Sequence, residues 1–138
     1  MDRIETDQML ADRGLRRTGA RMAILTILER TNTHHSVSTL AQLAAAVRPT
    51  INASSVYRNV TAMTESGVLH CIEWAGELLY GLAITPHHHL ICQPCGTLLE
   101  IPAGDLDRTA ADLATGRRFT LNQAGQLLLG RCHQCSAA

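Results

Sequence analysis

Hydrophobic residues in the first half of the chain recur three and four positions apart, the spacing of amphipathic helices. They predict four helices: residues 3–13, a second helix that includes 22–28, and then 39–47 and 54–66. Thr18 and Ser38 are the expected caps of the second and third helices. The last three helices, with a short turn before the final one, resemble a helix-turn-helix.

After Gly67 the pattern favours short strands. Residues 68–74 and 78–81 predict a hairpin that turns at Ala75-Gly76-Glu77. A helix-turn-helix followed by a hairpin is typical of a winged helix, whose recognition helix would be residues 54–66. A three-helix core with a hairpin and no DNA-binding role is the alternative.

The remaining residues predict a small α/β unit. We expect strands at 87–93 and 97–101, a helix at 103–115, and a closing hairpin of residues 118–122 and 126–129 around Ala124-Gly125. The predicted fold class is therefore α+β, with a winged helix-turn-helix DNA-binding domain before a small α/β dimerisation domain. The expected domain bounds are 1–81 and 87–138, with a hinge at 82–86.

Composition narrows the possible functions. The 138 residues have a net charge of zero, but residues 1–66 contain eight Arg and six acidic residues, so the first half is mildly basic and suited to a polyanion. No apolar run approaches the roughly 18–20 residues that span a membrane, and the N-terminus does not resemble a signal peptide. We expect a cytoplasmic protein without a membrane partner.

Two Cys-x-x-Cys pairs provide the strongest chemical signal, at Cys92 and Cys95 and at Cys132 and Cys135. Each pair places two thiolates on one turn, the arrangement that a structural ZnS₄ site needs. A thioredoxin-like dithiol is the rival interpretation, but the apolar run 97–101 after the first pair does not resemble a helix start. A disulfide is a weaker alternative because no secretory signal is present.

The motifs together resemble the ferric-uptake-regulator (Fur) superfamily of metal-dependent repressors, and most closely its zinc uptake regulators. The matching segments are Gly14-Leu15-Arg16-Arg17-Thr18 with Arg21, Ser55-Val56-Tyr57-Arg58-Asn59-Val60, His87-His88-His89-Leu90-Ile91-Cys92 with Cys95-Gly96, and Gly130-Arg131-Cys132 with Cys135. The resemblance implies a homodimer that binds double-stranded operator DNA. It also implies a metal sensed at the hinge, whose binding closes the dimer onto that operator.

The resemblance also implies roles for individual residues. The four cysteines hold structural zinc, and Tyr57 and Arg58 contact DNA. Other candidate DNA-binding residues, taken from the exposed helix face and the basic start of the second helix, are Ser55, Asn59, Arg17 and Arg21. Candidate ligands of the regulatory metal are His87, His89, Glu100, His70, and either His34 or His35, of which we favour His35.

The chain also departs from the family pattern. The hinge supplies neither the Glu nor the Cys found in other members, and Pro86 and Ala124 stand where many members have His. We therefore expect the second regulatory site, which also uses positions like His88 and Asp107, to be lost. For the remaining regulatory site, His70 favours zinc, Glu100 makes iron the second choice, and nickel is third.

Catalysis is not expected, and neither is a small-molecule substrate. The His run is not followed by the Glu and Pro-Cys-x-x-Cys of a deaminase, and neither His-Glu-x-x-His nor Gly-x-Ser-x-Gly occurs. The alternatives to a zinc-responsive repressor are an iron- or nickel-responsive repressor or a peroxide sensor. A zinc-stabilised protein-interaction module is more distant.

Overall fold

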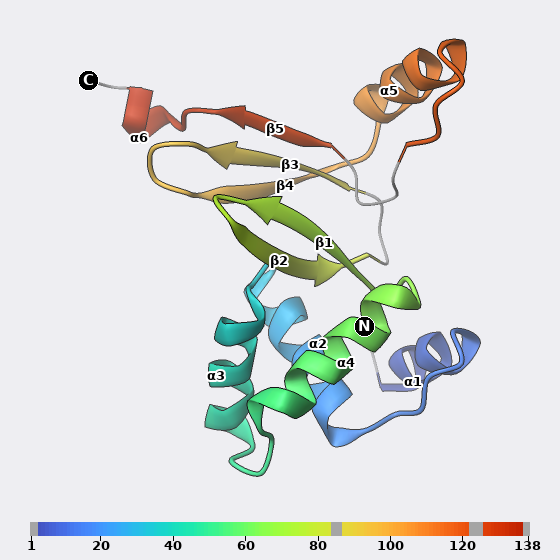
Figure 1. Ribbon diagram of the computed structural model, residues 1–138, viewed down its shortest axis with the longest axis vertical. Helices are drawn as coiled ribbons and strands as arrows, with labels where there is room; N and C mark the ends of the chain where they lie inside the picture. The colour runs from blue at the N-terminus through green and yellow to red at the C-terminus, as the bar shows by residue number, and fades with distance from the viewer. Residues whose placement is uncertain (1–2, 84–86, 122–125, 137–138) are drawn as a thin grey trace. The chain divides into compact units, whose positions relative to one another are not determined.

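The computed structural model describes residues 3–83, 87–121 and 126–136, which divide into two compact units, residues 1–84 and 85–138 (Figure 1). The division falls inside the range 82–86 that the sequence assigns to a hinge. Residues 84–86 of that hinge, including Pro86, lie outside the described residues, as does Ala124. No helix in the described ranges is long and apolar enough to cross a membrane.

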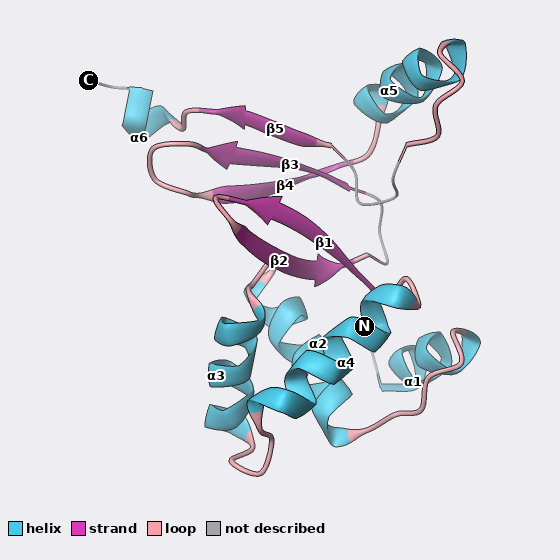
Figure 2. Ribbon diagram, viewed as in Figure 1, coloured by secondary structure: helices cyan, strands magenta, loops and turns pink. Residues whose placement is uncertain are grey.

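The N-terminal unit begins with helices at the predicted places (Figure 2). They are α1 (Arg3–Asp12), α2 (Gly19–Thr31), α3 (Val37–Val47) and α4 (Ala53–Glu65). As predicted, the Thr18 hydroxyl caps α2 and accepts a hydrogen bond from the Arg21 N–H. The predicted cap of α3 is wrong: the helix starts two residues earlier, so Ser36 accepts from the Thr39 N–H and Ser38 lies in the first turn.

The core of this unit is built almost entirely from aliphatic side chains on the inner faces of the helices. Its buried members are Met9, Leu10, Ile24, Leu25, Leu28, Leu40, Ala44, Val56, Val60, Met63, Val68 and Leu69. Each fully buried Leu, Ile or Val stabilises the fold by roughly 1.5–3 kcal/mol relative to an exposed one. Because Val56, Val60 and Met63 all point inward, α4 is fixed with its opposite face toward solvent.

Strands β1 (Leu69–Trp74) and β2 (Glu77–Leu82) form the predicted antiparallel hairpin. Ala75 and Gly76 both have positive φ, which is the backbone of a two-residue type I′ turn. The segment before α3 also joins this hairpin: His35 and Tyr80 exchange both backbone hydrogen bonds, at 3.0 and 2.8 Å. The loop that contains His34 and His35 is therefore fixed against β2.

The C-terminal unit is a three-stranded sheet with two helices. Its elements are β3 (His87–Cys92), β4 (Leu98–Pro102), α5 (Asp105–Gly116), β5 (Leu127–Gly130) and α6 (His133–Ser136). The strand order is β4-β3-β5, in which β3 pairs antiparallel with β4 and parallel with β5. The central strand is thus the one with three consecutive histidines.

The predicted closing hairpin is wrong. Its first half does not form in the described residues 118–121, because these residues close α5: Arg118 has φ 58°, and the N–H groups of Arg118 and Phe119 bond back to Thr115 and Ala114. This is a Schellman ending, usually built on glycine. Strand β5 pairs with β3 instead.

Candidate metal centres

The four cysteines converge in the C-terminal unit. Their sulfur atoms all lie within 4.8 Å of one another, and the Sγ atoms of Cys95 and Cys132 are 3.8 Å apart. A ZnS₄ tetrahedron with bonds of 2.3 Å has edges of about 3.8 Å. The end of β3 supplies Cys92 and the turn after it supplies Cys95, while Cys132 directly precedes α6 and Cys135 lies within it. The arrangement predicted from the two Cys-x-x-Cys motifs is therefore present at the right size for a metal ion.

The electrostatics of this cluster favour a cation. Hydrogen bonds from Thr97 lower the pKa of the Cys95 thiol to about 6, so one thiolate forms readily. The pKa of Cys135 is raised to about 12, first by its contact with Cys132 and then by Cys92. Four sulfurs so close cannot all become thiolates at neutral pH unless a positive ion compensates their charge, and a bound Zn²⁺ does this.

The three histidines of β3 divide between the two faces of the sheet. The rings of His87 and His89 are neighbours, with centroids 4.6 Å apart, as expected for strand positions two apart. His88 points the other way, where its Nδ1 accepts a hydrogen bond from the Gln126 N–H at 2.9 Å. Its Nε2 lies 3.8 Å from an Asp107 carboxylate oxygen. Two imidazoles on one face can thus serve one ion, whereas His88 helps to hold β5.

Glu100 lies on the same face as His87 and His89. It pairs with His89 across β3 and β4, and its carboxylate oxygen is 3.8 Å from His87 Nε2. Burial raises the pKa of Glu100, partly offset by His87. Burial also lowers the pKa of His89 to about 4, so its imidazole is neutral and able to bind metal at physiological pH. The C-terminal unit therefore presents two imidazoles and a carboxylate.

In the N-terminal unit the second histidine pair is His34 with His70. Their Nε2 atoms are 2.7 Å apart, and both side chains are buried. The choice of His35 over His34 is not supported by this geometry, since His35 Nε2 instead contacts the Thr31 hydroxyl at 2.8 Å. Adjacent residues of an extended segment point to opposite sides, so only one of the two can face His70. The backbone bridge between His35 and Tyr80 determines which one, and the sequence alone did not reveal it.

Cys71 does not belong to either histidine pair. It lies opposite Tyr80 in the hairpin, and its thiol bonds the Tyr80 side chain. Burial raises the pKa of Cys71, so this cysteine remains a thiol at neutral pH. Its contacts are those of a small, partly buried packing residue.

Of the four α4 residues that the sequence assigned to DNA, Tyr57 and Arg58 are exposed, whereas Ser55 and Asn59 are half-buried. Tyr57 is 61% exposed and Arg58 is also exposed, on the face opposite the buried Val56 and Val60. Asn59 is half-buried: it bonds the Ser55 carbonyl and accepts from Arg21 Nε at 3.0 Å. Tyr57 and Arg58 can therefore reach a groove, whereas Asn59 helps to fix α4 against α2.

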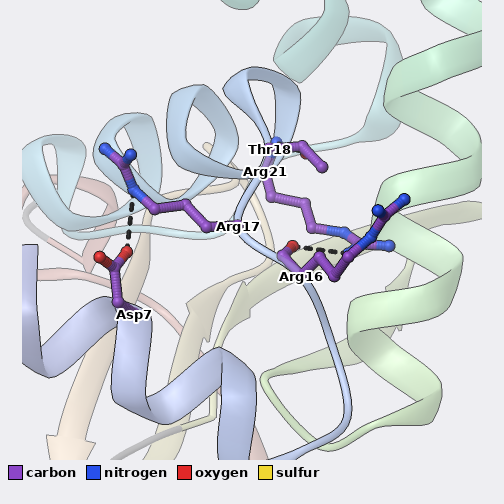
Figure 3. Close-up of polar contacts among 5 residues, drawn as sticks. All are labelled: Asp7, Arg16, Arg17, Thr18 and Arg21. Atoms are coloured by element: carbon purple, nitrogen blue, oxygen red, sulfur yellow. Dashed lines mark hydrogen bonds and ion pairs between the residues drawn. The ribbon is translucent and has the colours of Figure 1, made fainter.

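The two arginines at the start of α2 also have partners within the unit (Figure 3). Arg17 Nε lies 2.8 Å from the Asp7 carboxylate on α1, and Arg21 donates to the Arg16 carbonyl at 2.7 Å. Arg17 is exposed and can exchange Asp7 for a phosphate, but Arg21 is held by two bonds. A phosphate-binding role therefore suits Arg17 better than Arg21.

Comparison with known proteins shows the family to which the chain belongs. Residues 12–126 match the ferric uptake regulator family. A ferric uptake regulation protein of Bordetella parapertussis is 30% identical over 129 residues, which cover 91% of this chain and 93% of the relative. The chain belongs to the ferric uptake regulator family.

Solved structures of ferric uptake regulators and their relatives share the fold. The regulator of Vibrio cholerae has a TM-score of 0.71 and 25% identity, covering 92% of this chain and 99% of its own. A zinc uptake regulator complexed with zinc and DNA has a TM-score of 0.70 and 23% identity, covering 96% of this chain and 91% of its own. The predicted α+β class is thus confirmed, and the chain is a metal-responsive transcriptional regulator of this family.

Proposed function

We propose that this chain is a zinc-responsive repressor, which binds operator DNA as a homodimer when a regulatory ion joins its two units. The observation that carries the proposal is the pairing of imidazoles in each unit. His34 faces His70 in the first unit, and His87 lies beside His89 in the second, where Glu100 adjoins. The protein acts on DNA, so we place it in the cytoplasm.

The mechanism is a shift between orientations of the two units. An ion bound by histidines from both units favours the orientation in which those histidines meet, by its differential affinity for that state. In a homodimer this orientation sets the spacing between the two α4 helices, and hence between the Tyr57 and Arg58 side chains that read each half-site. The cysteine site holds a structural zinc and keeps the second unit folded in either state.

The dimer interface would be the leucine row of the C-terminal sheet. Leu99, Leu90 and Leu128 are direct cross-strand neighbours on β4, β3 and β5, so their side chains point to one face. Leu99 is 54% exposed and its neighbours are more than a third exposed. A unit of this size is only marginally stable unless it buries more apolar surface, and packing against the same row of a second copy would bury it.

The donor set favours zinc. Neutral imidazole suits zinc, nickel and ferrous iron, whereas manganese prefers oxygen ligands. Four imidazoles with one nearby carboxylate satisfy a tetrahedral zinc site most directly. Ferrous iron remains the second candidate because of Glu100.

The test is a DNA-binding titration in buffered free metal. Purified dimer carrying structural zinc is mixed with a fluorescent fragment from upstream of its own gene, and anisotropy is followed against Zn²⁺, Fe²⁺, Mn²⁺ and Ni²⁺. We expect Zn²⁺ to induce binding at the lowest free concentration, and His89→Ala to abolish induction. Equal DNA binding with and without metal would refute a metal-responsive repressor. Induction by Fe²⁺ alone would refute only the zinc preference.

As a matched control, His133→Ala should bind DNA like the parent. His133 is an exposed residue of the second cysteine motif and belongs to neither histidine pair. A loss of induction in this control would mean that histidine replacement harms the protein in general. The result for His89→Ala would then not support His89 as a ligand.

A further inference from the structure

Gly81 lies in β2 between His34 and His70 of the N-terminal unit. In the hairpin its direct cross-strand partner is His70. On its other side, the antiparallel bridge between His35 and Tyr80 places His34 opposite Gly81, because the register advances by one residue on each segment. The three residues therefore form one row, in the order His34, Gly81, His70.

Residues in one row of a sheet point to the same face, so the two imidazoles rise on either side of the glycine. Two strand spacings separate their backbones, roughly 10 Å. The side chains span that gap by leaning toward each other, with ring centroids 4.7 Å apart and Nε2 atoms 2.7 Å apart. They meet over Gly81, whose lack of a side chain leaves the space.

A side chain at position 81 would remove that space. A Cβ built on Gly81 lies 2.5 Å from both Cε1 and Nε2 of His34, and 2.7 Å from its Cδ2. Real Cβ contacts are not this short, so the His34 ring would have to move from its place beside His70. The φ of Gly81 is not in the left-handed region, so the backbone does not strain alanine there, and the three shortest contacts of its Cβ are all with His34.

We propose that Gly81 is a positioning residue of the regulatory metal site. It admits the His34 ring beside His70, so that the first unit offers a pair of imidazole nitrogen donors. This inference rests on the proposed function, and it identifies the residue that lets His34 and His70 lie side by side as ligands. A tetrahedral zinc ion separates two nitrogen ligands by roughly 3.3 Å, so the 2.7 Å pair needs to open by only about 0.6 Å.

The test compares Gly81→Ala, His34→Ala and the double variant by cobalt titration. Each protein keeps its structural zinc, and Co²⁺ binding at the regulatory site is followed by its visible absorption, with Zn²⁺ affinity from competition against a chelator. We expect Gly81→Ala to weaken both metals at least tenfold and to lower the tetrahedral cobalt absorption, as His34→Ala does. The double variant should be no weaker than His34→Ala, because both changes remove the same ligand.

The double variant also distinguishes the loss of a metal ligand from a general folding defect. If the contact with His34 is the only harm that alanine causes, removing the imidazole should restore the thermal stability of Gly81→Ala. Gly116→Ala is the matched control, since a Cβ there meets nothing within 4 Å, and it should bind Co²⁺ like the parent.

Two results would overturn the proposal. One is parental cobalt affinity and absorption in Gly81→Ala while His34→Ala is weak. The other is a double variant that remains unfolded or binds metal more weakly than His34→Ala. If instead His34→Ala and His70→Ala both bind Co²⁺ like the parent, the regulatory ligand set itself is wrong, and the proposed function fails rather than the role of Gly81 alone.

Discussion

Replacing His88 with leucine should destabilise the C-terminal sheet without removing a metal ligand. His88 is 1% exposed, and its Nδ1 accepts the Gln126 N–H at 2.9 Å, at the entrance to β5. Leucine fills a similar volume but accepts no hydrogen bond. A partly buried N–H left without an acceptor costs about 1–3 kcal/mol, and we expect about 2 kcal/mol here.

Hydrogen exchange read by mass spectrometry measures this loss locally. A cost of 2 kcal/mol raises the population of the open state about 30-fold, so amides of 126–129 should exchange about 30-fold faster. Trp74 is the chain's one tryptophan and lies in β1, so its fluorescence reports on the N-terminal unit, which should not change. His88→Asn is the matched variant, because its amide oxygen can replace Nδ1 as acceptor, and it should lose less protection than His88→Leu.

Two outcomes would contradict this assignment. Equal protection of 126–129 in the leucine variant and the parent would show that the hydrogen bond contributes nothing. A leucine variant that keeps its protection but binds one metal ion fewer would make His88 a ligand. We expect the second regulatory site to be lost because of the departures at Pro86 and Ala124. Such a result would show that this site is present after all.

Four further outcomes follow from the described contacts. Cys92→Ser should lower tightly bound zinc, measured by elemental analysis, from one ion per chain to almost none; retained zinc would exclude the four-sulfur site. Leu99→Glu should convert the dimer to monomer in sedimentation, because it buries a charge in the leucine row; an unchanged mass would place the interface elsewhere. Arg58→Ala should weaken DNA binding and reduce the salt slope by about one, with unchanged metal content. Because the pKa of His89 is lowered, the unfolded chain takes up a proton below about pH 6.5 and the folded chain does not. Between pH 7 and 5.5, the free energy of unfolding of the parent should therefore fall by about 1 kcal/mol more than that of His89→Phe. Parallel pH profiles of urea unfolding for the two proteins would disprove this.

The sequence predicted the elements whose pattern is local. Helices α2 and α4 were predicted because Ile24 and Leu28, or Val56 and Val60, repeat at helical spacing over several turns. The hairpin followed from its Ala-Gly turn, and the cysteine site followed from two motifs whose geometry is largely contained within each motif.

The failures came from contacts between segments far apart in the chain. Residues 118–121 look like a strand, but Arg118 and Phe119 close α5, and β5 pairs in parallel with β3 instead. Nothing near residue 127 predicts that partner. Likewise, His34 and His35 are equivalent in the sequence until the backbone bridge to Tyr80 turns one of them toward His70.

The two candidate metal centres differ in charge, and that difference suits them to different tasks. Four thiolates carry more negative charge than a Zn²⁺ ion neutralises, and contact with Cys132 and Cys92 raises the pKa of Cys135 to about 12. An ion bound there is held tightly and leaves slowly, as a structural role requires. Among the imidazole ligands that we propose, His89 has its pKa lowered by burial to about 4, so it loses no proton when metal binds near pH 7. We therefore expect binding at the proposed histidine site to be weaker and reversible, so that its occupancy follows the free metal concentration while the cysteine site stays full.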